Sequence, residues 1–192
     1  MADAGRVIAG TARGIRLDAP GEGTRPLGDR VKQTLFAILE PAIDGARVLD
    51  LFAGSGAAGI EALSRGAAHA TFVERDAGAA KVIAANLARA GFGDRAAAAV
   101  VKREALAWLR DPARAAEPPW DIVIIDPPYA DTVALASTLE AVGAIVVRDG
   151  RVVAKHFWRD APPARIGLLA SERERRFGET ALTFYRRVAE DA

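Results

Sequence analysis

The sequence predicts an α/β fold in which a mostly parallel, seven-stranded sheet is covered by helices on both faces. A short apolar run at residues 47–51 leads into a glycine-rich turn and then into a helical pattern that ends at Gly66. Further apolar runs alternate with helical patterns through the middle of the chain, as expected of βαβ units. Acidic residues follow several of these runs, at the edge of the sheet where open α/β folds bind their ligands.

The first 45 residues are expected to form a small extension, with residues 46–192 as one compact domain. Residues 1–5 suggest a frayed leader, and residues 6–10 and 15–17 predict a short hairpin. After a Gly/Pro-rich loop, a helix is expected from Asp29, as its N-cap, to about Leu39. This extension is not needed to build the sheet, so it is free to contact a substrate.

The glycine-rich turn is the stretch around which the rest of the chain is organised. Gly54 and Gly56 allow a sharp turn and let a ligand approach the backbone closely. The helix that follows presents free N–H groups at the positive end of its dipole. The spacing Gly54-x-Gly56-x-x-Gly59 also matches the dinucleotide-binding pattern, which leaves an NAD-dependent oxidoreductase open as an alternative. A structural turn between a core strand and a helix is a second alternative.

Acidic residues at three predicted strand ends indicate which kind of ligand the glycine-rich turn would bind. Asp50 lies at the tip of the first strand, where it would repel a pyrophosphate and attract a ligand that carries an ammonium group. Glu74 lies at the offset typical of an acid that binds ribose hydroxyls. Glu104 is placed either to accept a hydrogen bond from an adenine amino group or to be a plain acid at the N-terminus of a helix, where it is favourable to the dipole.

The remaining elements complete the predicted sheet. The other strands are expected at residues 70–74, 97–102, 120–125, 151–155, 166–169 and 180–187, the last two antiparallel. The other helices are expected at residues 77–90, from Glu104 through Leu109, and at residues 133–142.

The most specific motif in the chain is Asp126-Pro127-Pro128-Tyr129, which ends the buried strand at residues 120–125. Two consecutive prolines remove two backbone donors, so the local carbonyls can only accept hydrogen bonds. Asp126 and the Pro127 carbonyl can therefore accept from an exocyclic amine, while Tyr129 stacks on the ring that carries the amine. Accepting both amine protons favours a pyramidal nitrogen whose lone pair can attack a methyl group. A plain strand-end turn is the structural alternative.

The composition excludes several other chemistries. The 192 residues contain no cysteine, which excludes disulfides, thiolate metal sites and methylation of pyrimidine C5 through a cysteine adduct. His69 and His156 are the only histidines and lie far apart in the sequence, so no metal site is expected. Without an apolar stretch of transmembrane length or a signal-peptide core, we expect a cytoplasmic protein with no membrane contact.

Arginine dominates the basic residues, although the formal net charge is only +1. Planar guanidinium groups suit phosphate contacts and base stacking. The C-terminal group is Arg173, Arg175, Arg176, Arg186 and Arg187. The N-terminal group supplies the candidates for substrate binding, which are Arg13, Arg16, Arg25 and Arg30. An ordinary solvated surface with salt bridges is the alternative for both groups.

Taken together, these motifs resemble those of class I methyltransferases that use S-adenosylmethionine. In particular they resemble the bacterial family that methylates guanine N2 in 16S ribosomal RNA, and the resemblance covers nearly the whole chain. It rests on residues 24–26, 29–36, 49–56, 61–66, 72–74, 126–129 and 177–180.

This resemblance implies a Rossmann-like fold, S-adenosylmethionine as methyl donor, S-adenosylhomocysteine as product, and no metal. The implied substrate is 16S ribosomal RNA in the small subunit or an assembly intermediate, methylated by a monomer. The expected cofactor-binding residues are Asp50, Phe52, Ala53, Gly54, Gly56, Glu74, Arg75, Glu104 and Ala105. The expected catalytic residues are Asp126, Pro127, Pro128 and Tyr129.

Three positions depart from the pattern of that family. Leu27-Gly28 replaces a small hydroxyl pair, and Gln33 replaces a glutamate. Lys155-His156 ends a strand where a glutamate is commoner, which changes the local charge. DNA adenine N6 methylation uses the same acid-Pro-Pro-aromatic motif and remains an alternative, as does a non-catalytic RNA-binding module of the same fold.

Overall fold

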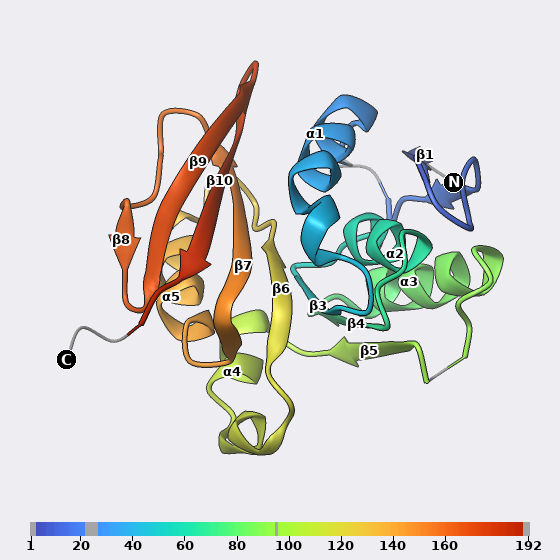
Figure 1. Ribbon diagram of the computed structural model, residues 1–192. Coiled ribbons are helices and arrows are strands. Elements are labelled where there is room, and N and C mark those ends of the chain that lie inside the picture. Colours follow the sequence, from blue (N-terminus) through green and yellow to red (C-terminus); the bar gives the residue numbers. More distant parts are fainter. Residues whose placement is uncertain (1–2, 22–26, 95, 190–192) are drawn as a thin grey trace.

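The structure is a computed structural model that describes residues 3–21, 27–94 and 96–189 (Figure 1). Its strands are β1 (Asp3–Arg6), β2 (Arg16–Asp18), β3 (Arg47–Leu51), β4 (His69–Glu74), β5 (Ala98–Lys102), β6 (Trp120–Ile125), β7 (Val146–Phe157), β8 (Arg165–Ile166), β9 (Leu169–Phe177) and β10 (Thr180–Arg187). Its α-helices are α1 (Asp29–Leu39), α2 (Ala57–Ser64), α3 (Ala77–Arg89), α4 (Ala105–Leu109) and α5 (Thr132–Val142). Short 3₁₀ helices cover Glu40–Ala42 and Pro112–Ala116.

One sheet of eight strands forms the centre of the described part of the chain, in the order β5-β4-β3-β6-β7-β10-β9-β8. The strands from β5 to β7 are parallel, and β10, β9 and β8 are antiparallel to their neighbours. The predicted mostly parallel α/β fold is therefore confirmed, with β8 as an additional short edge strand. The chain runs outward from β3 to β5 and then returns to β6, so β3 and β6 flank the topological switch point where such sheets bind ligands.

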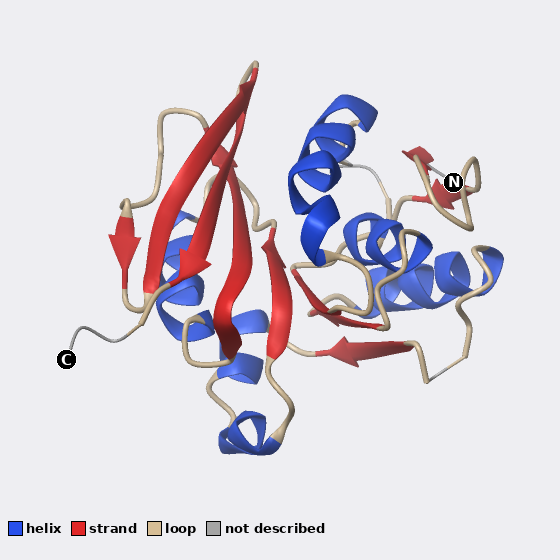
Figure 2. Cartoon of the chain, viewed as in Figure 1, coloured by secondary structure: helices blue, strands red, loops and turns tan. Residues whose placement is uncertain are grey.

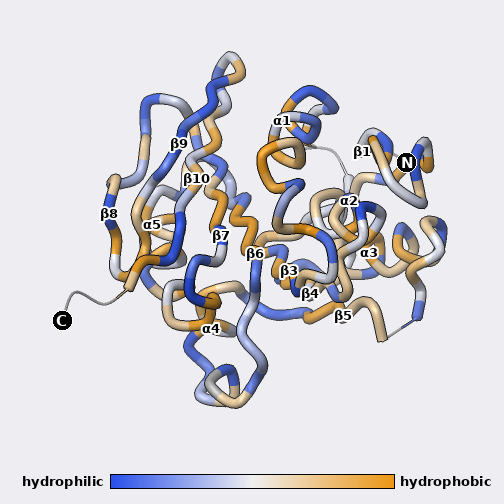
Figure 3. The backbone as a smooth tube through the Cα atoms, in the orientation of Figure 1, coloured by the Kyte–Doolittle hydropathy of each residue, from blue (hydrophilic) through white to orange (hydrophobic). Residues whose placement is uncertain are grey.

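Helices cover both faces of this sheet (Figure 2). On one face, Ile60 of α2 and Ile83 of α3 share a core with Val48 of β3. On the other face, Leu139 of α5 packs in a second core with Leu49. Adjacent residues of β3 thus enter opposite cores, as the alternation of side chains along a strand requires. Figure 3 shows the contrast between the apolar inner strands and the hydrophilic β9 near the edge of the sheet.

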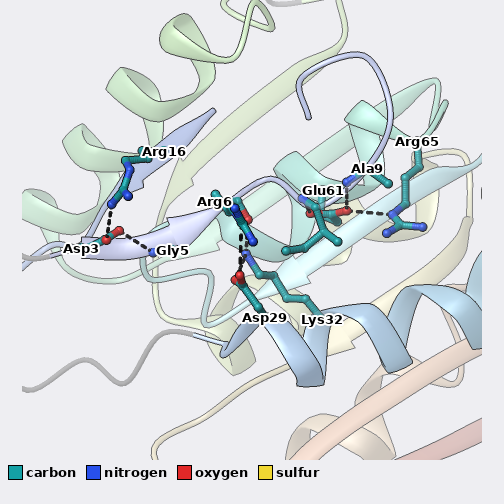
Figure 4. Close-up of polar contacts among 10 residues, drawn as sticks. Asp3, Gly5, Arg6, Ala9, Arg16, Asp29, Lys32, Glu61 and Arg65 are labelled. Atoms are coloured by element: carbon teal, nitrogen blue, oxygen red, sulfur yellow. Dashed lines mark hydrogen bonds and ion pairs between the residues drawn. The ribbon is translucent and has the colours of Figure 1, made fainter. Parts of the chain in front are cut away.

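The N-terminal segment docks on α2 through hydrogen bonds (Figure 4). The Glu61 carboxylate accepts from the backbone N–H groups of Ile8 (2.7 Å) and Ala9 (3.1 Å). Close approach makes glycine necessary at position 10, because a Cβ on Gly10 would lie 1.6 Å from the Ser64 carbonyl oxygen. Val7 of this segment is buried in the core that α2 shares with β3. The division of the chain at residue 45 stays a prediction.

Three N-terminal details differ from expectation. Residues 3–5, within the expected frayed leader, belong to β1 together with Arg6, and β1 pairs with β2 as a hairpin. Residues 7–10, expected as strand, are not strand, because the Ile8 and Ala9 N–H groups donate to Glu61 of α2 and not to a neighbouring strand. Asp29 starts α1, but Gly28 is the N-cap residue. The Asp29 carboxylate instead pairs with Arg6 at 3.3 Å.

The C-terminal strands also differ from expectation. β9 spans Leu169–Phe177, whereas the sequence predicted a strand only at residues 166–169. Most of β9 is exposed and charged, so it lacks the apolar alternation that predicts a strand. Its pairing with β10 defines it instead, with Arg175 opposite Leu182. Among the described residues, no helix has the length and apolar character needed to cross a membrane.

Candidate functional site

A cavity of about 680 Å³ opens at the carboxyl ends of the parallel strands. The turns after β3, β4, β5 and β6 supply most of its wall, and β7 and the N-terminal segment complete it. This volume lies within the range of small-molecule sites, and the position is the switch point of the sheet. The elements of the fold thus bring residues that are far apart in sequence to one cavity.

The turn between β3 and α2 forms one wall and has a strained backbone. Phe52 has a φ of 60°, a conformation that is uncommon for a residue other than glycine. Gly54 and Gly56 follow with φ values of 55° and 76°. Their predicted role in a sharp turn is confirmed. Gly59 is required by packing, because a Cβ there would lie 2.3 Å from the Phe72 ring.

Asp50 lines the cavity at the end of β3 with only 2% of its surface exposed. Its Oδ2 accepts a hydrogen bond of 2.9 Å from the Gly59 N–H. Burial raises the pKa of Asp50 to about 8, and the negative charges of Asp126 and Glu74 add to this, while the bond from Gly59 opposes it. A cationic ligand group beside Asp50 would favour the ionised form.

Glu74 and Glu104 line the same cavity and also hold backbone in place. One oxygen of Glu74 accepts from the Gly54 N–H at 2.9 Å, and the other accepts from the Asp76 N–H at 2.8 Å. Glu74 therefore links the end of β4 to the glycine turn. Glu104 is the N-cap of α4 and accepts from Leu106 N–H and Ala107 N–H. The helix-terminus alternative for Glu104 is confirmed.

The Asp126-Pro127-Pro128-Tyr129 turn forms the opposite wall of the cavity. The Tyr129 hydroxyl is hydrogen-bonded to Thr180 Oγ1 of β10 at 2.5 Å. Its ring lies 6.3 Å from that of Phe157 at the end of β7. β7 and β10, the next two strands on one side of β6 in the sheet, thus support the turn.

Lys155 of β7 is a residue of this site to which the sequence analysis assigned no role. Its Nζ lies 2.5 Å from Asp126 Oδ1 and 5.0 Å from the centroid of the Tyr129 ring. Burial raises the pKa of Asp126, and the adjacent Lys155 ammonium opposes that rise. The signal in the sequence was a lysine directly after the apolar run Val152–Ala154, because parallel strands end at the same edge of a sheet.

The structure brings together all but one of the expected cofactor-binding and catalytic residues. The cavity is lined by Asp50, Phe52, Ala53, Gly54, Glu74, Arg75, Glu104, Ala105, Asp126, Pro127, Pro128 and Tyr129. Gly56 is the exception, since it is the N-cap of α2 and is buried behind the wall. Cofactor binding by this set stays a prediction.

Of the expected substrate-binding arginines, the described Arg13, Arg16 and Arg30 are not part of the cavity wall. Arg13 and Arg30 are exposed, and Arg16 is exposed but paired with Asp3 at 2.9 Å. Arg25, like the rest of the Thr24-Arg25-Pro26 stretch, lies outside the described residues. Ala19, Pro20, Gly21 and Leu27 of the N-terminal segment do line the cavity, which the sequence analysis did not predict.

Residues 61–66, one of the stretches that carry the family resemblance, do not line the cavity and instead bind the N-terminal segment. Glu61 binds the N-terminal segment and also accepts from Arg65 Nε at 2.8 Å. Ser64 Oγ donates to the Ala9 carbonyl at 2.6 Å and accepts from the Ala12 N–H at 2.9 Å. These polar residues of α2 therefore fix the segment that carries Ala19 and Pro20 to the cavity.

The fold and this site define the chain as one of methyltransferase architecture. A structure solved for a candidate methyltransferase of Escherichia coli, YhhF, matches with a TM-score of 0.82 and 33% identity, over 96% of this chain and 98% of that one. The model of the family described as Conserved hypothetical protein 95 matches residues 5–186. The chain belongs to this family, which includes the ribosomal RNA small subunit methyltransferase D proteins.

Two relatives show how far the similarity extends. A candidate rRNA methyltransferase of Bacillus subtilis, YlbH, is 37% identical over 95% of this chain and 98% of its own length. Ribosomal RNA small subunit methyltransferase D of Escherichia coli is 44% identical over 125 residues, 65% of this chain and 60% of the relative. In that second alignment, the chain spans less than two thirds of the relative.

Proposed function

We propose that this protein transfers a methyl group from S-adenosylmethionine to the exocyclic N2 amine of a guanine in 16S ribosomal RNA. The observation that carries the proposal is that Asp126 and Tyr129 line the same cavity as the glycine turn and Asp50. An acceptor for an amine and a surface for a ring thus lie beside a turn suited to a nucleoside cofactor. Membership in a family with rRNA methyltransferases favours RNA as the substrate.

The residues present fit S-adenosylmethionine. Asp50 would hold its ammonium group, Glu74 its ribose hydroxyls, and the backbone near Gly54 its methionine portion. When bound, it supplies a methyl group on a sulfonium, which moves to the amine nitrogen as the sulfur–carbon bond breaks. The wall that Glu74 and Gly54 form is braced by their 2.9 Å hydrogen bond, so the protein need not reorganise to bind.

The chain's own residues would act on the amine. The Asp126 carboxylate and the Pro127 carbonyl accept hydrogen bonds from the two amine protons, and Tyr129 stacks on the base. As the nitrogen acquires positive charge during the reaction, the Asp126 carboxylate stabilises it. A proton then leaves the nitrogen, with Asp126 as the adjacent acceptor.

The carboxylate also favours guanine over adenine. Guanine offers two donors side by side, N1–H and N2–H, and a carboxylate can accept from both. Adenine presents the N1 acceptor beside its amine, and the carboxylate would repel it. DNA adenine methylation is therefore the weaker alternative for this chain.

RNA would reach the cavity across a surface that carries exposed cations and an aromatic ring. The guanidinium of Arg176 lies 3.6 Å from the centroid of the Trp158 ring, and Arg159 lies 4.8 Å from it. Trp158 follows Phe157, which contacts Tyr129. Such a row can stack an unpaired nucleotide beside the target base. We propose that the protein does this as a monomer in the cytoplasm, on a small-subunit particle.

The test is transfer of labelled methyl groups to small-subunit particles from cells that lack the gene, with DNA as the competing substrate. We expect labelled N2-methylguanine in 16S rRNA and none in DNA, with activity abolished in Asp126→Ala. S-adenosylhomocysteine should bind that variant with little loss. Labelled adenine in DNA, or near-normal turnover in Asp126→Ala, would contradict the proposal.

A further inference from the structure

Lys155 contacts both functional side chains of the Asp126-Pro127-Pro128-Tyr129 turn. β6 and β7 are parallel with Ile125 opposite Ala154, so Asp126 and Lys155 are the next residues along the two strands. The Lys155 side chain is only 12% exposed, and its Nζ contacts Asp126 at 2.5 Å. It also lies over the Tyr129 ring at 5.0 Å, within the range of a cation–π interaction.

A second buried lysine shows what a structural lysine does in this fold. Lys32 of α1 is 0% exposed, and its Nζ binds the Arg6 carbonyl at 2.5 Å. It ties α1 to the N-terminal hairpin and does not line the cavity. Lys155 differs, because it lines the cavity and its polar contact is with a carboxylate proposed to act on substrate.

We propose that Lys155 is a positioning residue that keeps Asp126 ionised and fixed in place for methyl transfer. The inference rests on the proposed function. The ammonium takes one acceptor position on Oδ1, and the other acceptor positions of the carboxylate are left for the guanine donors. Lys155 itself touches neither the reacting nitrogen nor the methyl group, so its effect passes through Asp126.

The charges around Asp126 explain why this support is needed. Asp50, which is buried, adds its charge from β3, and the Asp126 side chain is only 18% exposed. The other charged or titratable groups of the cavity wall are Glu74, Arg75, Asp76, Arg103, Glu104, Tyr129 and Asp131. Burial favours the neutral form of Asp126, and the Lys155 ammonium, in direct contact, favours the carboxylate. A protonated Asp126 could neither accept both donors of a guanine nor receive a proton after transfer.

The test compares Lys155→Met, which removes the charge, with Lys155→Arg, which keeps it. For Lys155→Met, we expect kcat at neutral pH to fall about tenfold to a hundredfold, the scale of a misplaced group. The acidic limb of its pH–rate profile should move to higher pH, so raising the pH restores part of the loss. Lys155→Arg should keep the limb near its wild-type position.

A second readout does not depend on activity. The carboxyl resonance of Asp126, assigned in ¹³C-aspartate-labelled protein by its loss in Asp126→Asn, should titrate at higher pH in Lys155→Met than in wild type. Lys32→Met is the matched control, since it removes a buried lysine outside the cavity. It should lower the Tm without moving either the pH–rate limb or the Asp126 resonance.

The outcomes separate this inference from the proposed function. If wild type methylates RNA and Lys155→Met has an unchanged pH profile and Asp126 titration, Lys155 is not a positioning residue. A faster Lys155→Met enzyme would also overturn the inference, because the ammonium would then be repelling the charge that develops on the amine. If wild type methylates no RNA, the proposed function fails, and the Asp126 titration still decides whether Lys155 controls its ionisation.

Discussion

At the scale of single residues, the site depends on side chains that other strands hold in place. Tyr129 has its ring at the cavity and its hydroxyl bonded to Thr180 Oγ1 at 2.5 Å. Asp126 is held by Lys155 at 2.5 Å. Each functional side chain of the turn therefore has a polar partner from β7 or β10, and a substitution at the partner should be felt at the turn.

The hydroxyl of Tyr129 gives the first prediction. Tyr129→Ala should abolish most activity, because it removes the stacking ring. Tyr129→Phe and Thr180→Val each lose one hydrogen bond, worth about 0.5–1.5 kcal/mol, so each should lower kcat at most about tenfold. Since both remove the same bond, the double variant should be no worse than either single one. Additive losses in this kinetic cycle would show that the bond does not orient the ring.

The buried carboxyl of Asp50 gives the second prediction. Its pKa is raised to about 8, from an ordinary value of 3.8. Between these values the folded protein keeps a proton that the unfolded chain has lost, so this group makes the protein less stable as the pH rises. Asp50→Asn keeps an oxygen for the Gly59 N–H and does not titrate.

As the pH rises from about 4 to about 8, the free energy of unfolding of wild type should therefore fall relative to that of Asp50→Asn. The slope should approach at most about 1.4 kcal/mol per pH unit. Urea unfolding across this range, without cofactor, measures it. Parallel stability curves for the two proteins would mean that Asp50 is ionised in the folded state throughout.

At the scale of elements, α2 joins the N-terminal segment to the sheet. Glu61 is 0% exposed and holds Ile8, Ala9 and Arg65. Arg65 in turn pairs with Glu40, which lies after α1 (Figure 4 shows Arg65 beside Glu61). This arrangement couples the position of α1 and the hairpin to the helix that follows the glycine turn.

The third prediction concerns this junction. Glu61→Ala leaves backbone N–H groups and Arg65 without their partner, so it should cost about 3–5 kcal/mol of unfolding free energy, as expected when a buried ion pair is broken. Glu40→Ala is the matched control, because it removes the exposed partner of the same arginine and should cost about 0.2–1 kcal/mol. Equal losses in chemical denaturation would contradict the buried role of Glu61.

At the scale of the whole molecule, much of the arginine charge is neutralised locally. Arg6, Arg16, Arg65, Arg89, Arg103, Arg114, Arg151 and Arg186 all form ion pairs with carboxylates. With a net charge of +1, long-range attraction to RNA must then depend on the arginines that remain unpaired. Arg13 is such a residue, since none of the described carboxylates pairs with it.

The fourth prediction follows from this difference between arginines. Arg13→Ala should weaken binding to small-subunit particles and reduce the slope of log affinity against log salt by about 0.7–0.9, the value for one phosphate contact. Arg16→Ala should change the slope less, because Asp3 already neutralises Arg16. Both variants should bind S-adenosylhomocysteine like wild type. Equal slopes for wild type and Arg13→Ala would mean that Arg13 makes no phosphate contact, and Arg159 and Arg176 would be the next candidates.

The parallel core, and the acids that follow its strands, could be predicted from the sequence alone. Apolar runs at β3, β4 and β6 indicate burial locally, and glycines after β3 and prolines after β6 mark where those two strands stop. The acids at positions 50, 74 and 126 follow from that register, because parallel strands present their carboxyl ends to one edge. These features depend on neighbours in sequence, which is why they could be predicted.

The long-range partner of each polar side chain could not be predicted and is known from the three-dimensional structure. Glu61 lies within residues 61–66, one of the stretches that carry the family resemblance, and its carboxylate binds the N-terminal segment. β9 has no apolar alternation and is a strand only because β10 pairs with it. Lys155 is an unexplained charge in the sequence until β7 lies beside β6 and brings its ammonium to Asp126. Contacts of this kind depend on which elements become neighbours, and a local pattern carries no information about that.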